Sequence, residues 1–328
     1  MTHLVMKADL RSTPGIGADH SALYRSFLDM CEWADGLRGT TTQVTISEHH
    51  CAPDGYMPSP IVTAAAALGR TKRLTVRMTL LLPLYDPIRL AEDLAVLDLT
   101  SGGRMSIVLG AGYRSEEFDM LGVDIEARGQ LMEEYIGVLK LAWTGEPFEY
   151  RGRSALVLPR PFQRPRPPIV MAGSSPGSAR RAARHADGYL PNHPDLLNVY
   201  REELERLGRA PGPIGAMKPC FKWVVAVAND PDATWEQVGP FCLHEMNSYA
   251  EWAVKAAAGA NTAMYAYTAD TDSLRERGPF DVLTPAQCVE WIRNNDGTLV
   301  ISPLTGGLPP EVAWESLRLI ESDVLPEV

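Results

Sequence analysis

Short apolar runs alternate with longer segments of helical periodicity along almost the whole chain. The run 74–83, LTVRMTLLLP, is β-branched and aliphatic, and the segment 88–99 behind it repeats apolar residues at helical spacing. The predicted strands are 4–8, a run that begins at 44, 74–83, 105–109, 169–172, 188–191, 221–228 and 298–302. The predicted helices are 21–37, 60–69, 88–99, 125–143, one that contains 180–184, 196–207, 234–258 and 310–320.

This alternation predicts an α/β fold with a parallel sheet and right-handed crossovers. We expect the sheet to close into a (β/α)8 TIM barrel with insertions, rather than to remain an open doubly wound sheet. Polar groups or glycines follow the second, fourth and fifth strands, which is where barrel enzymes build their sites. The prediction is a single domain over 1–328, with an irregular stretch through Tyr113, Glu116, Glu117 and Gly122 and a hairpin at 148–158. A second irregular segment is expected at 259–285, and it suits a lid.

Composition narrows the class of protein without changing this fold prediction. The chain has 328 residues, of which 45% are hydrophobic and 22% charged, as in ordinary soluble globular proteins. A formal net charge of -10 argues against broad attraction to nucleic acid or anionic membranes. The five cysteines are scattered and contain no CxxC pair, so neither a disulfide framework nor a zinc knuckle is expected. We therefore expect a cytoplasmic protein that is neither exported nor integral to a membrane.

Candidate chemistry begins where the second strand runs into His49 and His50. Imidazole titrates close to physiological pH, so a histidine at a strand end suits proton transfer or ligand binding; the alternative is a hydrogen-bonded structural histidine. Adjacent residues of a strand point to opposite faces, so the two rings cannot chelate one metal from regular geometry. We predict no metal site, although Asp54, His193 or His244 could complete one with a histidine of this pair.

Glycines follow the fourth strand at Gly110 and Gly112. A dinucleotide-binding motif would need a third glycine where Ser115 stands, so that interpretation is weak. The alternative is that the glycines let the chain turn sharply at the rim, and this also lets a planar ligand approach the backbone closely.

Small and hydroxyl residues link the fifth strand to its helix, namely Gly173, Ser174, Ser175, Gly177 and Ser178. Free backbone N–H groups and serine hydroxyls at a helix N-terminus favour an anion, and Arg180 or Arg181 could add positive charge. The alternative is that Ser174 or Ser175 simply caps the helix, and both interpretations can hold together.

Several motifs in order carry a resemblance to a known family: SEHH, LGRTKRLTV, LLPLYDPIRLAEDLAVLDLTSGGR, GAGYRSEEFDMLGVD and AGSSPGSARRAARHADGY. With the ending LVISPLTGGLPPEVAWESL, the chain resembles the bacterial luciferase-like flavin monooxygenases over most of its length. The resemblance implies a (β/α)8 barrel that binds reduced flavin at its C-terminal mouth, either FMN or, in a sister group, the deazaflavin F420.

By motif position, the resemblance implies that His49 is the catalytic histidine and that Gly173 to Ser178 bind the flavin phosphate. It also implies that Thr79 and Leu80 carry a bulge or a non-proline cis peptide beneath the flavin ring. Luciferases proper have a basic residue near the flavin where this chain has Gly110 and Ala111, so light emission and an aldehyde substrate are not expected.

The function that the resemblance implies is a flavin-dependent monooxygenase. Reduced FMN from a separate flavin reductase would react with O2 and oxygenate a small organic substrate, with His49 as the acid or base. The alternatives are an F420-dependent dehydrogenase or reductase on the same barrel, and a catalytically inactive flavin-binding protein. Members of the family are often dimers, so we expect a homodimer.

Overall fold

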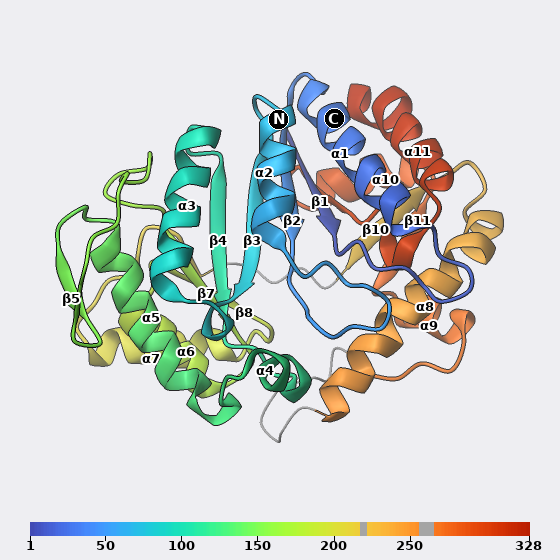
Figure 1. Ribbon diagram of the computed structural model, residues 1–328. Helices are drawn as coiled ribbons and strands as arrows, with labels where there is room; N and C mark the ends of the chain where they lie inside the picture. Colours follow the sequence, from blue (N-terminus) through green and yellow to red (C-terminus); the bar gives the residue numbers. More distant parts are fainter. Residues whose placement is uncertain (217–221, 256–265) are drawn as a thin grey trace.

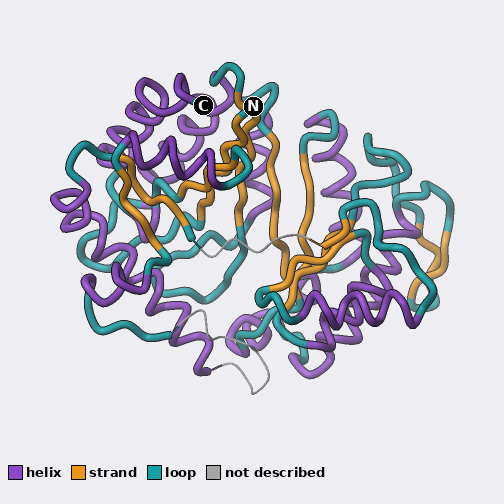
Figure 2. Tube along the Cα trace, turned by 180° about the vertical axis from the view of Figure 1, so that it is seen from behind, coloured by secondary structure: helices purple, strands orange, loops and turns teal. Residues whose placement is uncertain are grey.

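The computed structural model describes residues 1–216, 222–255 and 266–328. Within them, ten parallel strands form one sheet, and helices lie against it (Figures 1 and 2). The strands are β1 (Thr2–Ala8), β2 (Thr40–Ile46), β3 (Thr75–Leu81), β4 (Met105–Gly110), β7 (Ile169–Gly173), β8 (Gly188–Pro191), β9 (Gly215–Ala216), β10 (Trp223–Val227), β11 (Phe280–Leu283) and β12 (Thr298–Ile301). A separate hairpin pairs β5 (Phe148–Tyr150) with β6 (Arg153–Ala155), inside the predicted segment 148–158.

The strand order is that of a barrel. The sheet runs β11-β10-β12-β1-β2-β3-β4-β7-β8-β9, so that the first strand of the chain pairs with the last, β12, as well as with β2. An open doubly wound sheet would instead reverse its order at an internal strand. All eight predicted strands are present, and the predicted α/β barrel class is confirmed; between described residues, hydrogen bonds do not join the outer strands β9 and β11.

Eleven α-helices occur in the described residues: α1 (His20–Gly36), α2 (Pro60–Arg70), α3 (Pro87–Ser101), α4 (Ser115–Leu121), α5 (Arg128–Ala142), α6 (Pro176–His185), α7 (Leu196–Arg206), α8 (Pro231–Lys255), α9 (Thr271–Arg277), α10 (Pro285–Asn294) and α11 (Pro310–Leu319). Local chemistry sets their ends. In α3, the Asp86 carboxylate accepts from the N–H groups of Ile88 and Arg89, and Gly102 ends the helix with a φ of 64°.

Two segments expected to be irregular contain regular structure. Residues after Gly112 form the short helix α4, whose Phe118 is fully buried. In the expected lid at 259–285, residues 259–265 lie outside the described part, but 271–283 form α9 and the sheet strand β11. Leu274 and Phe280 are buried in a core cluster with α8, so this part is packed against the barrel. The lid itself remains a prediction.

The carboxyl ends of the strands face α4 and the second half of α8. Figure 1 shows both helices at the same end of the sheet, below the tips of β3 and β4. Functional side chains of barrel enzymes gather at this end, because every strand–helix loop opens there.

Candidate active site

His49 lies three residues beyond the end of β2, and its ring is almost completely buried, with 7% of the residue exposed. Its Nδ1 lies 2.7 Å from Oε1 of Glu117, a fully buried residue in the first turn of α4. The same oxygen accepts from the His50 backbone N–H at 3.0 Å and from Arg114 Nη1 at 3.1 Å. Three donors on one carboxylate oxygen therefore join the loop after β2 to the loop after β4.

His50 forms a separate carboxylate pair. Its Nε2 lies 2.9 Å from Oε1 of Glu48, and the same oxygen accepts from the Tyr85 hydroxyl at 2.7 Å. The other oxygen of Glu48 accepts from the backbone N–H of Leu81, the last residue of β3, at 2.7 Å. The two adjacent histidines thus point to different carboxylates, as expected for neighbours on an extended chain.

Four aromatic rings surround the His49 imidazole. The ring centroids of Trp252 and Tyr56 lie 4.8 and 4.9 Å from it, and those of Tyr113 and Tyr249 lie 5.6 and 6.2 Å from it. Tyr249 and Trp252 come from α8, far along the chain from the histidine. The rings exclude most water from the imidazole and lower the local dielectric, so charges placed here interact strongly.

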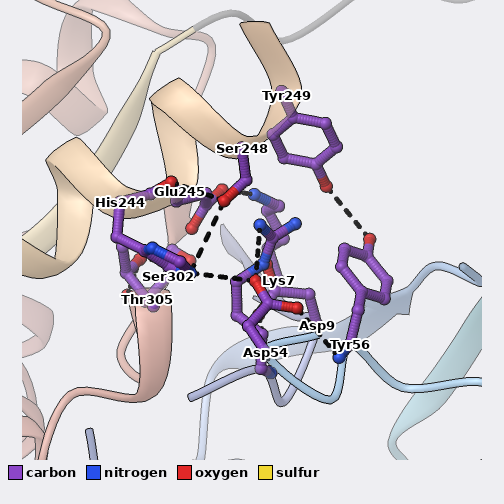
Figure 3. Close-up of polar contacts among 12 residues, drawn as sticks. Lys7, Asp9, Asp54, Tyr56, His244, Glu245, Ser248, Tyr249, Ser302 and Thr305 are labelled. Atoms are coloured by element: carbon purple, nitrogen blue, oxygen red, sulfur yellow. Dashed lines mark hydrogen bonds and ion pairs between the residues drawn. The ribbon is translucent and has the colours of Figure 1, made fainter. Parts of the chain in front are cut away.

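A second buried network lies beneath α8 (Figure 3). The fully buried Arg11 donates to Asp9 Oδ2 at 2.9 Å and to Asp54 Oδ2 at 3.3 Å, and His244 Nε2 lies 2.9 Å from that second oxygen. The Arg11 guanidinium also lies 4.5 Å from the ring centroid of Tyr56. Buried ions need such partners, because an uncompensated charge in a low-dielectric interior costs several kcal/mol, of the order of 3–5.

Helix α8 is fastened to the strand ends by side chains of one face. Glu245 pairs with Lys7 on β1, and the Tyr249 hydroxyl lies 3.1 Å from that of Tyr56. Figure 3 shows these contacts side by side, with the two tyrosine hydroxyls directed toward each other. The helix is therefore positioned over the mouth by polar contacts as well as by packing.

The environments move the pKa values of the two histidines in opposite directions. Burial lowers the pKa of His49, and the hydrogen bond to Glu117 opposes that shift only in part. The hydrogen bond to Glu48 raises the pKa of His50, although burial opposes it. Burial would raise the pKa of Glu117, but hydrogen bonds from His49 and the His50 N–H outweigh it and hold that pKa below its usual value. Both directions favour a neutral His49 ring beside an ionised Glu117.

The predicted strand-three segment is regular. Thr79 is half-buried and Leu80 fully buried, and β3 keeps an unbroken register with β4 from Val76 to Leu81. The cis peptide bonds in the described residues are Leu158-Pro159 and Arg164-Pro165. The prediction of a bulge or non-proline cis peptide at Thr79 and Leu80 is therefore wrong for this structure. Strand β3 ends at Leu81, whose N–H donates a hydrogen bond to Glu48.

Gly110 is the last residue of β4 and Gly112 lies two residues beyond it, and both are half-buried. Gly112 has a φ of 74°, and a Cβ there would come within 2.8 Å of the Phe118 ring, so a side chain is excluded. Gly110 has room for a Cβ, since the nearest atom would be 3.6 Å away. The backbone at Gly110 is therefore uncovered by a side chain of its own, whereas the Phe118 ring fills the space beside Gly112.

The loop from Gly173 to Ser178 is a capped helix start. Ser175 is the N-cap of α6, its Oγ accepts from the Ser178 N–H at 3.2 Å, and Ser178 Oγ lies 3.2 Å from the Ser175 N–H. A Cβ on Gly173 would clash with Ser178 Oγ at 2.1 Å, so glycine is required there. Ser174 and Gly177 take no part in this cap, and both lie at the N-terminal end of α6, which is the positive end of the helix dipole. Both interpretations of the loop, cap and anion site, remain compatible.

Charge near this loop is smaller than the sequence suggested. Arg181 donates to Glu133 Oε1 on α5 at 3.1 Å, so its charge is paired with a carboxylate of another helix. Arg180 is exposed on α6. The N-terminus of α6 is thus the main positive feature that the described residues offer here.

Reasoning from sequence selected His49 but missed its partners. Glu117 and Arg114 were part of a segment expected to be irregular, and Arg11, Tyr249 and Trp252 received no role. A signal was present for Arg11, because the Asp9-Leu-Arg11 triplet directly follows β1. Of the possible metal partners, Asp54 pairs with His244, and within the described ranges no group of three or more His, Cys, Asp or Glu side chains could hold a metal ion. In the same part of the chain, no helix is long and apolar enough to cross a membrane.

Comparison with known proteins gives one family match. The model of the luciferase-like monooxygenases matches residues 38–300. The oxygenase component of the flavin-dependent trigonelline monooxygenase of Acinetobacter baylyi is 30% identical over 193 residues, 56% of this chain and 52% of that protein. The FMNH2-dependent dimethylsulfone monooxygenase of Pseudomonas putida is 31% identical over 140 residues, 40% of this chain and 39% of that protein. The chain spans about half or less of the length of these curated relatives.

Solved structures share the fold. Monooxygenase RslO1 from Streptomyces bottropensis superposes with a TM-score of 0.71 at 24% identity, over 99% of both chains. The oxygenating constituent of 3,6-diketocamphane monooxygenase from Pseudomonas putida, solved with FMN, gives 0.70 at 20% identity, over 100% of this chain and 99% of that one. An F420-dependent secondary alcohol dehydrogenase gives 0.64 at 18% identity, over 95% and 98%. The diketocamphane enzyme was solved with FMN and the alcohol dehydrogenase with an F420–acetone adduct, so one fold accompanies two different cofactors in these neighbours.

Proposed function

Since this chain belongs to the luciferase-like monooxygenase family, we propose that it is a flavin-dependent monooxygenase that uses reduced FMN and O2 to oxygenate a small organic substrate. The observation that carries the proposal is the His49–Glu117 pair, a buried histidine and carboxylate inside an aromatic enclosure at the carboxyl ends of the strands. Oxygen chemistry on a reduced flavin needs a dry site with a controlled proton supply, and this arrangement offers both.

The residues of the mouth fit a flavin. Gly110 has no side chain and the atom nearest to a Cβ there would be 3.6 Å away, which would let a planar ring approach, and Thr79 lies on the neighbouring strand. The start of α6, with Ser174 and Gly177 outside the cap, would hold the phosphate. Bound there, a reduced flavin supplies the electrons for oxygen activation.

The protein's own part is proton management and the exclusion of water. Neutral His49 has its Nδ1 bonded to Glu117, so Nε2 is the atom that takes or returns a proton. The rings of Tyr56 and Trp252 keep bulk water from the imidazole. The substrates of the relatives, trigonelline and dimethylsulfone, are small organic molecules, and a substrate of that size suits an enclosed mouth.

Titration of the purified protein with FMN and with F420 separates the two enzyme readings. Tighter binding of FMN, followed by substrate-dependent oxygen uptake with chemically reduced FMN, supports the proposal. Tighter binding of F420 would turn it toward a hydride-transfer dehydrogenase or reductase, and flavin binding without turnover toward an inactive binder. His49→Ala should lower turnover by about two to four decades while flavin affinity changes little, because a positioned acid or base is worth that much.

Partners and location are part of the same proposal. A separate reductase would supply the reduced flavin; the trigonelline relative is likewise the oxygenase component of its enzyme. A homodimer and a cytoplasmic location remain predictions, the second because Cys31, Cys51, Cys242 and Cys288 are free thiols among the described residues. Size-exclusion chromatography with light scattering measures the first directly.

A further inference from the structure

We propose that Glu117 is a positioning residue for His49: it fixes the proton on Nδ1, leaves Nε2 as the basic nitrogen, and stabilises the imidazolium that forms when Nε2 takes a proton. The consequence for turnover rests on the proposed function, but the geometry does not. No motif match assigns this carboxylate a role, and it belongs to a helix that the sequence did not predict.

The direction of the hydrogen bond follows from the charge of Glu117. An ionised carboxylate has no hydrogen to donate, so the hydrogen between Nδ1 of His49 and Oε1 of Glu117 belongs to the ring. A neutral imidazole carries one N–H, and with Nδ1 protonated the lone pair is on Nε2. Nε2 has no hydrogen-bond partner among the described residues, so it remains available to a reacting group.

Glu117 is itself held in place. Arg114 Nη1 donates to the same Oε1 at 3.1 Å and to the His50 carbonyl, and the Arg114 guanidinium lies 4.2 Å from the Trp252 ring centroid. The His50 N–H supplies the third hydrogen bond. Glu117 is fully buried, so no solvent competes for Oε1, and the carboxylate cannot rotate without losing all three donors.

The role of the Glu117 carboxylate follows from the proton transfer at Nε2 of His49. When Nε2 accepts a proton from a reacting group, the ring becomes a cation in a nearly dry enclosure, and the reacting group keeps the electron pair. Desolvation opposes that cation, as the lowered pKa of His49 indicates. The neighbouring anion offsets the cost, and the ring returns the proton from Nε2 later in the cycle, with Nδ1 protonated throughout.

The test is Glu117→Gln, matched by Glu116→Gln. Glu116 is the exposed neighbour on the same helix, so its variant controls for one lost negative charge on α4. In 15N NMR of histidine-labelled protein, with the signal assigned by His49→Asn, the parent should show the Nδ1–H tautomer. In Glu117→Gln, the His49 pKa should fall further and turnover should drop roughly 100-fold, with the KM for substrate and flavin affinity little changed. Glu116→Gln should behave as the parent in every measurement.

The outcomes separate this inference from the proposed function. An Nε2–H tautomer in the parent, or an unchanged His49 titration in Glu117→Gln, overturns the positioning role. The parent protein could neither bind flavin nor take up oxygen and still show the Nδ1–H tautomer of His49, with a His49 pKa that falls in Glu117→Gln. In that case the monooxygenase proposal fails and the positioning role stands. If Glu117→Gln does not fold, the tautomer of the parent and the His49 titration in Glu117→Asp still test the positioning role. The shorter aspartate keeps the carboxylate, so His49 should show the parental tautomer with a longer hydrogen bond from Nδ1.

Discussion

Asp54→Asn should destabilise the protein, because it removes the negative charge that both Arg11 and His244 contact in the buried network beneath α8. The Asp54 carboxylate is 5% exposed and contacts both Arg11 at 3.3 Å and His244 at 2.9 Å. Asparagine has nearly the same shape, so packing is kept and only the charge is lost. Arg11 retains Asp9 at 2.9 Å, so the cost should be smaller than the 3–5 kcal/mol of a fully stranded buried ion; we expect about 2 kcal/mol at pH 7.

The pH dependence gives a second signature. Burial alone would raise the pKa of Asp54, but the hydrogen bond from His244 and the charge of Arg11 outweigh burial and hold it below its usual value. A depressed carboxyl pKa contributes stability that is complete above the unfolded value of about 3.9, and this stability is lost as pH falls through the folded value. The difference between parent and variant should therefore be full at pH 7 and shrink below about pH 4.

Urea unfolding followed by circular dichroism measures this difference at each pH. The control is Asp93→Asn, which removes a half-exposed carboxylate paired with Arg89 on α3 and should cost less than about 0.5 kcal/mol. Equal stability of Asp54→Asn and the parent at pH 7, or a difference that stays constant down to pH 3, would refute the assignment of this carboxylate as a buried, charge-paired group.

Three further outcomes follow from the site and the packing. Ser174→Asp should weaken FMN binding in a fluorescence titration at least tenfold, because a carboxylate at the start of α6 repels the phosphate; unchanged affinity would remove the phosphate site from this loop. Gly173→Ala should lower the melting temperature, since its Cβ would lie 2.1 Å from Ser178 Oγ; a parental melting curve would contradict the required close approach. Leu274→Ala should cost about 2–4 kcal/mol in chemical unfolding, because that side chain is fully buried; a cost near zero would mean that α9 is a loosely attached cover.

The barrel was predictable because its strands and helices are encoded locally. Most of the strands are short apolar runs followed by a helix-period segment, and several helix ends carry ordinary capping residues, as Asp86 and Gly102 show for α3. Helix α10 was not predicted, although the sequence carries a helix-start signal for it. Thr284 and Gln287 form a reciprocal cap, and Pro285 occupies the first helical position. Strand β9 is two residues long, too short for a periodic pattern to stand out, and β11 lies inside the segment 259–285 that was expected to be irregular.

The site was predictable only as far as single strand ends reveal it. His49 stands out because a titratable side chain follows β2, but its contact with Glu117 spans 68 residues of sequence. No local pattern gives such a pairing, since it depends on the loops after β2 and β4 meeting at the mouth. The predicted bulge or cis peptide at Thr79 rested only on the family resemblance, and the backbone at that point is an ordinary strand.

Helix α8 shows how a sequence could reveal which helix covers a site. Its predicted segment fits an ordinary barrel helix, yet Glu245, Tyr249 and Trp252 occupy positions i, i+4 and i+7 of one face. A face that packs only on a core would carry aliphatic residues there, because a buried carboxylate needs a buried cation. Lys7 supplies that cation from β1. A charged and aromatic stripe at core spacing therefore indicates a helix that packs against strand-end side chains, which in a barrel places it over the mouth.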